Sequence, residues 1–83
     1  MASAAALQND TIWLQANNYS VVSLNSKLSS HVQELAGAIR QGVSAYPDDH
    51  RDGFYDVELD NGWSYIHVRD DARTVYLVAY SRN

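Results

Sequence analysis

Residues 48–52 (DDHRD) form the densest group of potential metal ligands in this 83-residue chain. Carboxylate oxygens suit hard cations, and an imidazole can join them on a transition metal. The segment lacks the alternating Asp positions, the central Gly and the distal Glu of an EF-hand loop. We therefore interpret it as a solvated loop and predict neither a metal nor another cofactor.

Asp56 and His67 are the residues whose types could support acid–base chemistry. A carboxylate beside an imidazole can hold one tautomer and raise its pKa, provided that the two face each other across strands. No nucleophile, phosphate-loop or metalloprotease motif accompanies the pair, so no catalytic residue is assigned. The sequence favours a non-enzymatic protein, with a small hydrolase or nuclease as the catalytic alternative. The remaining histidine outside the loop, His31, is predicted to be exposed to solvent.

An amphipathic helix is predicted from about Ser26 to Ser44. Apolar residues recur there at the spacing of one helix face: Leu28, Val32, Leu35, Ile39 and Val43. Asn25 or Ser26 can cap its start, and Pro47 ends the element.

Three strands are predicted after the helix, over residues 54–59, 63–69 and 74–81. Asn61-Gly62 fits the two positive-φ positions of a tight hairpin turn. Before the helix, residues 10–16 and 19–24 suit a hairpin around Asn17-Asn18, with a helix over residues 3–16 as the alternative. The expected fold is α+β in the order β-β-α-β-β-β, with one amphipathic helix on an antiparallel sheet that ends in a three-stranded meander. It forms one domain over residues 1–83, with residues 1–9 a candidate disordered segment.

The Asn-Gly turn sets the pairing of the predicted strands and therefore the two faces of the sheet. It pairs Glu58 with Tyr65, Asp56 with His67, and Phe54 with Arg69. One face is aliphatic and suits the helix: Tyr55, Val57, Leu59, Ile66, Val68, Val75, Leu77 and Ala79. The other carries rings among charged side chains, which is unusual because a half-solvated sheet should alternate between apolar and polar faces.

The ring-bearing face predicts a binding surface. Its candidate interface residues are Phe54, Trp63, Tyr65, His67, Tyr76, Val78 and Tyr80. Three occupants remain open: the N-terminal segment of the same chain, a second copy in a homodimer, or a small ligand or protein partner. The leading hypothesis is a non-enzymatic interaction protein that self-associates through this face, and the alternative is a monomeric binding module.

Charge and composition exclude several classes of protein. The formal net charge is −4, with eight acids and four bases in residues 48–83, which disfavours a nucleic-acid partner. The chain has no cysteine, which excludes disulfides and thiolate metal sites. It has no apolar run long enough for a membrane span, and Met1–Leu7 does not have the pattern of a signal peptide. We expect a soluble, cytoplasmic protein with no membrane partner.

The stretch from Gly53 to Arg82, which ends VRDDARTVYLVAYSR, resembles the C-terminal meander of small toxins of the RelE/ParE type. The resemblance implies a helical segment followed by antiparallel strands, and it makes a toxin-like ribonuclease another alternative. Ribonucleases of that family use Arg, Lys, His or Tyr around the RNA, and its members are usually basic. Residues 48–83 carry −4, so no site residue is assigned from the resemblance.

Overall fold

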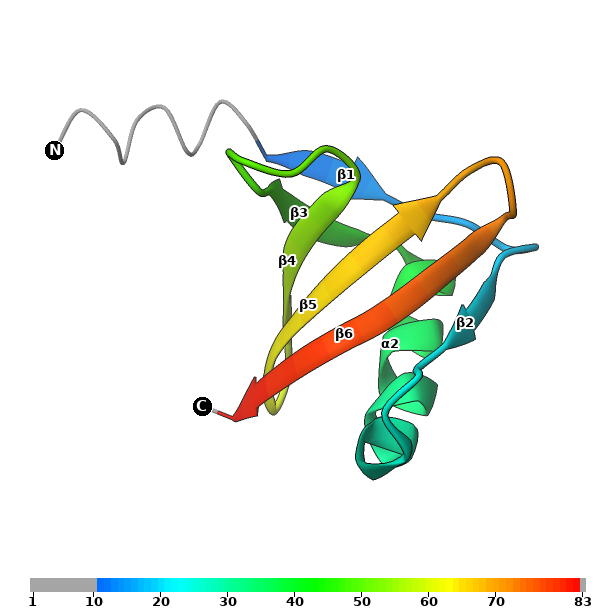
Figure 1. The fold of residues 1–83 in the computed structure, drawn as a ribbon, viewed down its shortest axis with the longest axis vertical. Helices are drawn as coiled ribbons and strands as arrows, with labels where there is room; N and C mark the ends of the chain where they lie inside the picture. The colour runs from blue at the N-terminus through cyan, green and yellow to red at the C-terminus, as the bar shows by residue number, and fades with distance from the viewer. Residues whose placement is uncertain (1–10, 83) are drawn as a thin grey trace, which may run out of the picture.

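The computed structural model describes residues 11–82, which form a six-stranded sheet with one α-helix packed against it (Figure 1). The strands are β1 (Ile12–Leu14), β2 (Ser20–Val22), β3 (Val43–Pro47), β4 (Phe54–Leu59), β5 (Gly62–Arg69) and β6 (Thr74–Arg82). Their order across the sheet is β1-β3-β4-β5-β6-β2. A 3₁₀ helix, η1 (Ser26–Leu28), leads into α2 (Ser29–Gln41). Among these residues there is no helix with the length and apolar character to cross a lipid bilayer.

The expected fold class is confirmed: one helix lies against a mostly antiparallel sheet. The helix is shorter than predicted, because Gly42 ends α2 with a φ of 97° and donates its amide to Ala38 O at 2.8 Å. A Cβ at Gly42 would lie 2.2 Å from the Trp13 ring, so only glycine fits there. Val43, predicted as the last apolar residue of the helix, instead begins the additional strand β3.

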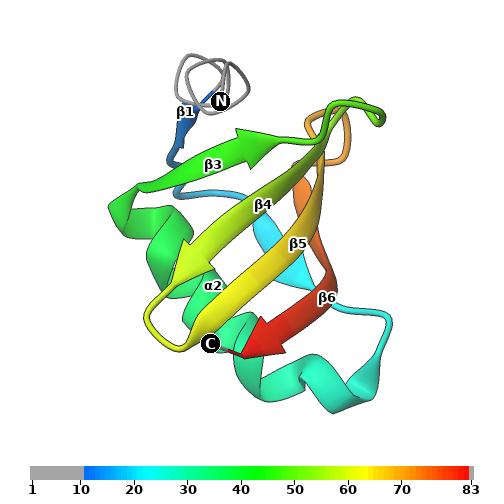
Figure 2. The same cartoon turned by 90° about the vertical axis from the view of Figure 1, so that its left-hand side faces the viewer.

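The two N-terminal segments are strands, but the predicted hairpin between them is wrong. β1 pairs antiparallel with β3, whereas β2 pairs parallel with β6, so they lie at opposite edges of the sheet (Figures 1 and 2). A helix over residues 3–16 is also wrong for its described part, since Ile12–Leu14 is a strand. The candidate disordered segment 1–9 lies outside the described residues.

The core lies between α2 and the face of the sheet that we call the inner face. Its buried apolar side chains are Leu35 and Ile39 from the helix and Ala45, Val57, Leu59, Ile66, Val75 and Leu77 from the strands. The aliphatic face predicted for the strands is thus confirmed at five of these positions. Fully burying one such side chain contributes roughly 1.5–3 kcal/mol, so this layer provides most of the stability.

The β4–β5 turn lies one residue earlier than predicted, which shifts the pairing of the two strands by two residues. Leu59 pairs with Gly62, so Asp60 and Asn61 form the turn and Gly62 is the first residue of β5. A Cβ at Gly62 would lie 2.3 Å from the carbonyl oxygen of Ser81, so the glycine serves the close approach of β6 rather than the turn. Because a two-residue displacement preserves alternation, both faces of β4 and β5 keep their predicted members.

A β-bulge in β6 changes which side chains face the helix. Tyr65 pairs with Ala79 and Ile66 with Leu77, which leaves Val78 as the extra residue. Ala79 therefore lies on the outer face, and Tyr80 lies on the inner face, opposite to the prediction for both. The ring of Tyr80 stacks on His31 at 3.6 Å, so His31 is half-buried rather than exposed as predicted.

Candidate functional site

The outer face is the side of the sheet away from α2, and no element of residues 11–82 crosses it (Figure 2). β1 and β2 extend the sheet at its edges and leave this face open. The side chains that share it include Tyr46, Phe54, Asp56, Glu58, Trp63, Tyr65, His67, Tyr76 and Ala79. The N-terminal segment was one of the three predicted occupants; its strands β1 and β2 do not cover this face, and residues 1–10 lie outside the described residues.

Three rings form a row across β4, β5 and β6 at one end of the outer face. Phe54 pairs with His67 and His67 with Tyr76 in the strand register. The Phe54 and His67 rings stack with centroids 4.1 Å apart, and those of His67 and Tyr76 are 6.2 Å apart. The guanidinium of Arg51 covers the other side of Phe54, 3.8 Å from its centroid. We call these four residues the ring row.

The β3–β4 loop is fastened to the ring row by its own hydrogen bonds. The carbonyl oxygen of Gly53 accepts from the amide of Val68 at 2.8 Å and from His67 Nδ1 at 3.2 Å. Since a carbonyl can only accept, Nδ1 carries the proton in the neutral ring. Gly53 has a φ of 80°, a conformation that favours glycine and lets the chain turn from the loop into β4. Arg51 is thus held over the sheet by a backbone that the ring row itself anchors.

Asp48 and Tyr65 form a second link between the loop and the sheet. The Tyr65 hydroxyl donates to the Asp48 carboxylate, which also accepts from the amide of His50 at 2.9 Å. These two hydrogen bonds hold the pKa of Asp48 below its ordinary value. The bond between Tyr65 and Asp48 also raises the pKa of the Tyr65 hydroxyl. The loop is therefore more ordered than the predicted solvated segment, although Asp49, His50 and Asp52 remain exposed. Nowhere in residues 11–82 do three His, Asp or Glu side chains come together as a metal-ligand set.

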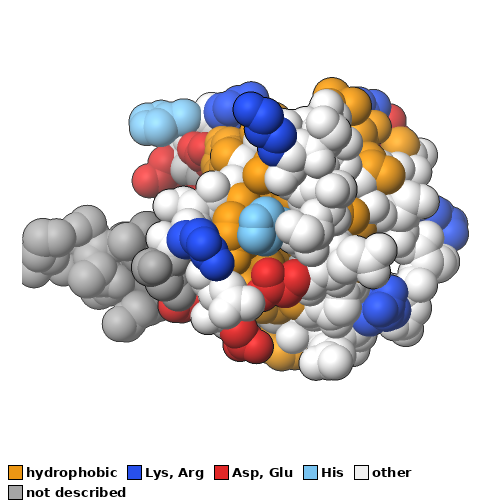
Figure 3. All heavy atoms as spheres, turned by 90° about the horizontal axis from the view of Figure 1, so that it is seen from below, with side chains coloured by type: hydrophobic (Ala, Val, Ile, Leu, Met, Phe, Trp, Pro, Cys, Tyr) orange, Lys and Arg blue, Asp and Glu red, His pale blue; other side chains and the backbone are white. Residues whose placement is uncertain are grey.

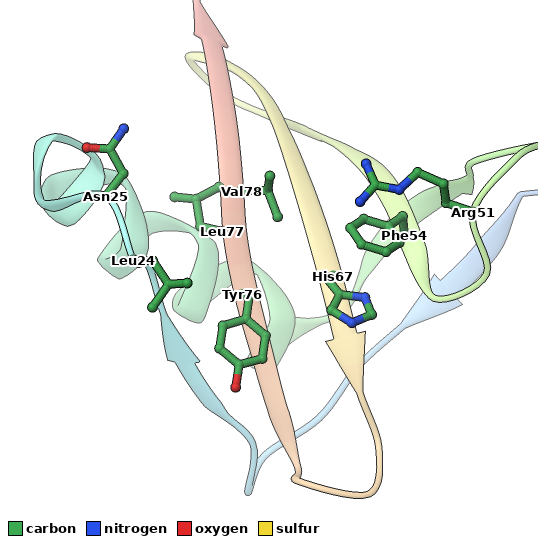
Figure 4. Close-up of a pocket in the computed structure, with 8 residues that line it drawn as sticks. All are labelled: Leu24, Asn25, Arg51, Phe54, His67, Tyr76, Leu77 and Val78. Carbon is green, nitrogen blue, oxygen red and sulfur yellow. The ribbon is translucent and has the colours of Figure 1, made fainter.

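A hollow of about 490 Å³ lies beside the ring row. It is lined by Leu24, Asn25, Arg51, Phe54, His67, Tyr76, Leu77 and Val78, and Figure 4 shows them converging from the loop, three strands and the segment after β2. Leu24 is 93% exposed, an unusual state for leucine. Its neighbours hold it there: Ser23 Oγ donates to Leu77 O at 2.8 Å and accepts from the amide of Asn25 at 3.2 Å.

The predicted pairing of Asp56 with His67 is wrong. Asp56 lies opposite Tyr65, and His67 lies opposite Phe54, as the two-residue shift in the pairing of β4 with β5 requires. Partial burial and the nearby charge of Asp48 raise the pKa of Asp56 above its ordinary value. The carboxylate therefore does not orient the imidazole, whose Nδ1 is engaged by Gly53.

The far end of the outer face has a different character, and we call it the Trp63 end. Trp63 lies opposite Glu58, is 36% exposed, and packs obliquely against Tyr46 with centroids 5.8 Å apart. The charged side chain of Glu58 beside Trp63 interrupts the apolar surface at this end. On the side of the molecule seen from below, hydrophobic side chains likewise reach the surface between acidic and basic ones (Figure 3).

The structure brings together four of the seven candidate residues, since Phe54, His67, Tyr76 and Val78 all line the hollow. Trp63 and Tyr65 lie on the same face outside it, and Tyr80 lies on the inner face. Sequence reasoning did not find Leu24, Asn25 and Arg51, which come from connecting segments. The only signal for Arg51 was its position two residues before the Gly53-Phe54 step, where the chain enters the sheet.

No protein-family model, curated protein or solved structure matches this chain. The resemblance to RelE/ParE toxins stays a prediction.

Proposed function

We propose that this chain is a non-enzymatic binding protein that takes a small ligand in the hollow of its outer face. One observation carries the proposal: rings and aliphatic side chains from four separate segments line a concave site that also holds a few polar groups. Such a combination is typical of ligand sites, whose volumes run from roughly 300 to 1,000 Å³. The site corresponds to the binding-module alternative predicted from the sequence.

The polar groups in the hollow suit recognition better than catalysis. Histidine is the most common acid–base side chain in enzyme sites. Here, however, Nδ1 of His67 bonds the carbonyl oxygen of Gly53, and the carboxylate predicted to orient the ring, Asp56, lies opposite Tyr65. Asn25 is also engaged, because its side-chain oxygen accepts from the amide of Lys27 at 3.0 Å. These contacts fix the walls of the hollow, which favours binding because the walls need little rearrangement.

Indole, a neutral flat probe, tests this function by amide chemical-shift perturbation in a ¹⁵N-labelled sample. We expect saturable shifts, with a Kd on the order of millimolar, confined to the amides around Leu24, His67, Tyr76 and Val78. Val78→Asp places a charge in the hollow and should abolish them. Trp63→Ala, on the same face but outside the hollow, should leave them unchanged. Shifts that do not saturate, or that persist in Val78→Asp, contradict the proposal.

Self-association is the second candidate function, and the exposed apolar side chains of the outer face favour it. Trp63 is 36% exposed and Val78 45% exposed, and a small domain gains buried area by pairing with a second copy. A second copy on this face would close the hollow, so ligand and dimer compete. Light scattering over a hundred-fold range of concentration should give twice the mass of the chain, and Trp63→Glu should return it to the monomer. A constant monomer mass excludes this candidate and leaves the hollow accessible.

A further inference from the structure

The charge that lines the hollow is opposite in sign to the net charge of the chain. Acids outnumber bases by ten to six in the sequence, yet the lining contains Arg51 and no carboxylate. The ion pair found within residues 11–82 joins Arg69 to Asp71 on the β5–β6 turn, and Arg51 takes no part in one. A guanidinium beside an apolar hollow is therefore left with hydrogen-bonding capacity to spare.

The way Arg51 packs keeps that capacity available. Its guanidinium carbon lies over the Phe54 ring, 3.8 Å from the centroid, and a guanidinium packed on a ring still presents N–H donors at its edge. Tyr65 engages part of this capacity, since its ring centroid is 6.0 Å away and its hydroxyl interacts with Arg51 as well as donating to Asp48, and the remaining donors are left for a ligand. Stacking on Phe54 also fixes the planar donor group, which favours bidentate recognition of a planar anion.

The acids of the same loop offset this charge only in part. Hydrogen bonds from Tyr65 and from the amide of His50 engage the Asp48 carboxylate and lower its pKa. The charge of Arg51 also contributes to the lowered pKa of Asp48, but that carboxylate is not part of the lining. Asp49 and Asp52 are exposed on the solvent side of the loop, where water and salt weaken their field over distances of about 8–10 Å. Their remaining effect is repulsion of an anion, so neutralising them should strengthen its binding.

Resting on the proposed function, we infer that the hollow recognises a flat aromatic carboxylate. The carboxylate binds the guanidinium of Arg51, and the ring lies among Leu24, Tyr76 and Val78. The separation of one cation from an apolar wall across a single hollow matches a ligand that is charged at one end and flat and apolar at the other (Figure 4). The volume of about 490 Å³ accommodates a bicyclic ring system with its acid group.

Three probes with the same ring and different charge test the inference on the full chain: 2-naphthoate, 2-naphthylmethanol and 2-naphthylmethylamine. Isothermal titration at neutral pH should show 2-naphthoate binding at least about tenfold more tightly than the neutral alcohol, and the ammonium probe more weakly still. Arg51→Gln should remove the preference for the anion, so that 2-naphthoate and the alcohol bind with similar affinity. Asp49→Asn with Asp52→Asn should increase the affinity for 2-naphthoate.

The matched control is Arg40→Gln, which removes the same charge from an exposed position in the last turn of α2 and should leave all three affinities unchanged. If none of the probes binds, the proposed function itself fails. If all three bind equally well, the hollow is a ligand site but the carboxylate inference is overturned. A preference for 2-naphthoate that survives Arg51→Gln overturns the assignment to Arg51. Circular dichroism on each variant establishes that it folds.

Discussion

The inner and outer faces of the sheet both carry apolar side chains, but of different kinds. The inner face is aliphatic and closed by α2, with Val57 and Ile66 fully buried. The outer face carries rings that stack on one another and is open over the residues described. Aliphatic chains interlock with a helix, whereas rings present flat, rigid surfaces with polar tips. The contrast suggests that the inner face provides stability and the outer face provides recognition.

The sharpest test of this contrast compares two leucines. Leu35 is fully buried against the inner face, and Leu24 is 93% exposed beside the hollow. Leu35→Ala should lower the free energy of unfolding by about 2–5 kcal/mol, because it leaves a cavity in the core. Leu24→Ala should change it by less than about 0.5 kcal/mol while weakening 2-naphthoate binding. Urea denaturation measures both, and equal losses of stability would remove the distinction between the faces.

Replacing two glycines by alanine, one inside α2 and one directly after it, should change the stability of the fold in opposite directions. Gly42→Ala forces a residue with a side chain into a φ of 97° and against Trp13, so it should cost more than about 1 kcal/mol. Gly37 lies inside α2, where an added Cβ meets no atom within 4 Å, so Gly37→Ala should stabilise by up to about 1 kcal/mol. Thermal unfolding of the two variants measures both changes in stability. Stabilisation by Gly42→Ala would mean that the helix does not end there.

On the outer face, Asp56→Asn should raise stability at neutral pH. The folded-state pKa of Asp56 lies above its ordinary value of 3.8, so folding disfavours the charged form. This cost is present above the folded pKa and disappears as the pH falls below 3.8, where the carboxyl is protonated in both states. The gain from Asp56→Asn should vanish over the same interval. Denaturation at several pH values measures it, and a gain that persists at pH 3 would assign it to another cause.

The smallest expected effect concerns Tyr65→Phe, which removes the hydrogen bond to Asp48 but keeps the ring. The folded-state pKa of Asp48 is lowered, so its contribution to stability is present above the ordinary value of 3.8 and is lost as the pH falls through the folded-state pKa. The variant should therefore be slightly less stable than the parent at neutral pH and equal to it in strong acid. NMR titration of the Asp48 carboxyl should show its pKa rising towards 3.8. An unchanged pKa would place its cause outside Tyr65.

The faces of β4 and β5 could be predicted from the sequence, because the alternation of side chains between the two faces is unchanged when the strand pairing shifts by two residues. The bulge at Val78 could not, since nothing in the run from Thr74 to Arg82 marks an extra residue, and the pairing of Tyr80 with Ser64 depends on it. Half of the hollow was also beyond sequence reasoning. Leu24 and Arg51 reach it through hydrogen bonds of Ser23 and Gly53 to distant strands, and local pattern carries no information about such contacts.

The parallel pairing of β2 with β6 has a consequence for the order in which the protein folds. Within residues 11–82, Ser20–Val22 lies at one edge of the sheet, and the strand beside it begins at Thr74. On the ribosome, β2 has no strand to join until that late part of the chain has been made, whereas β3, β4 and β5 can pair as each emerges. Contacts of such sequence separation slow folding because a long loop must close first. The segment that carries Leu24 should therefore be the last to dock, and the hollow the last feature to form.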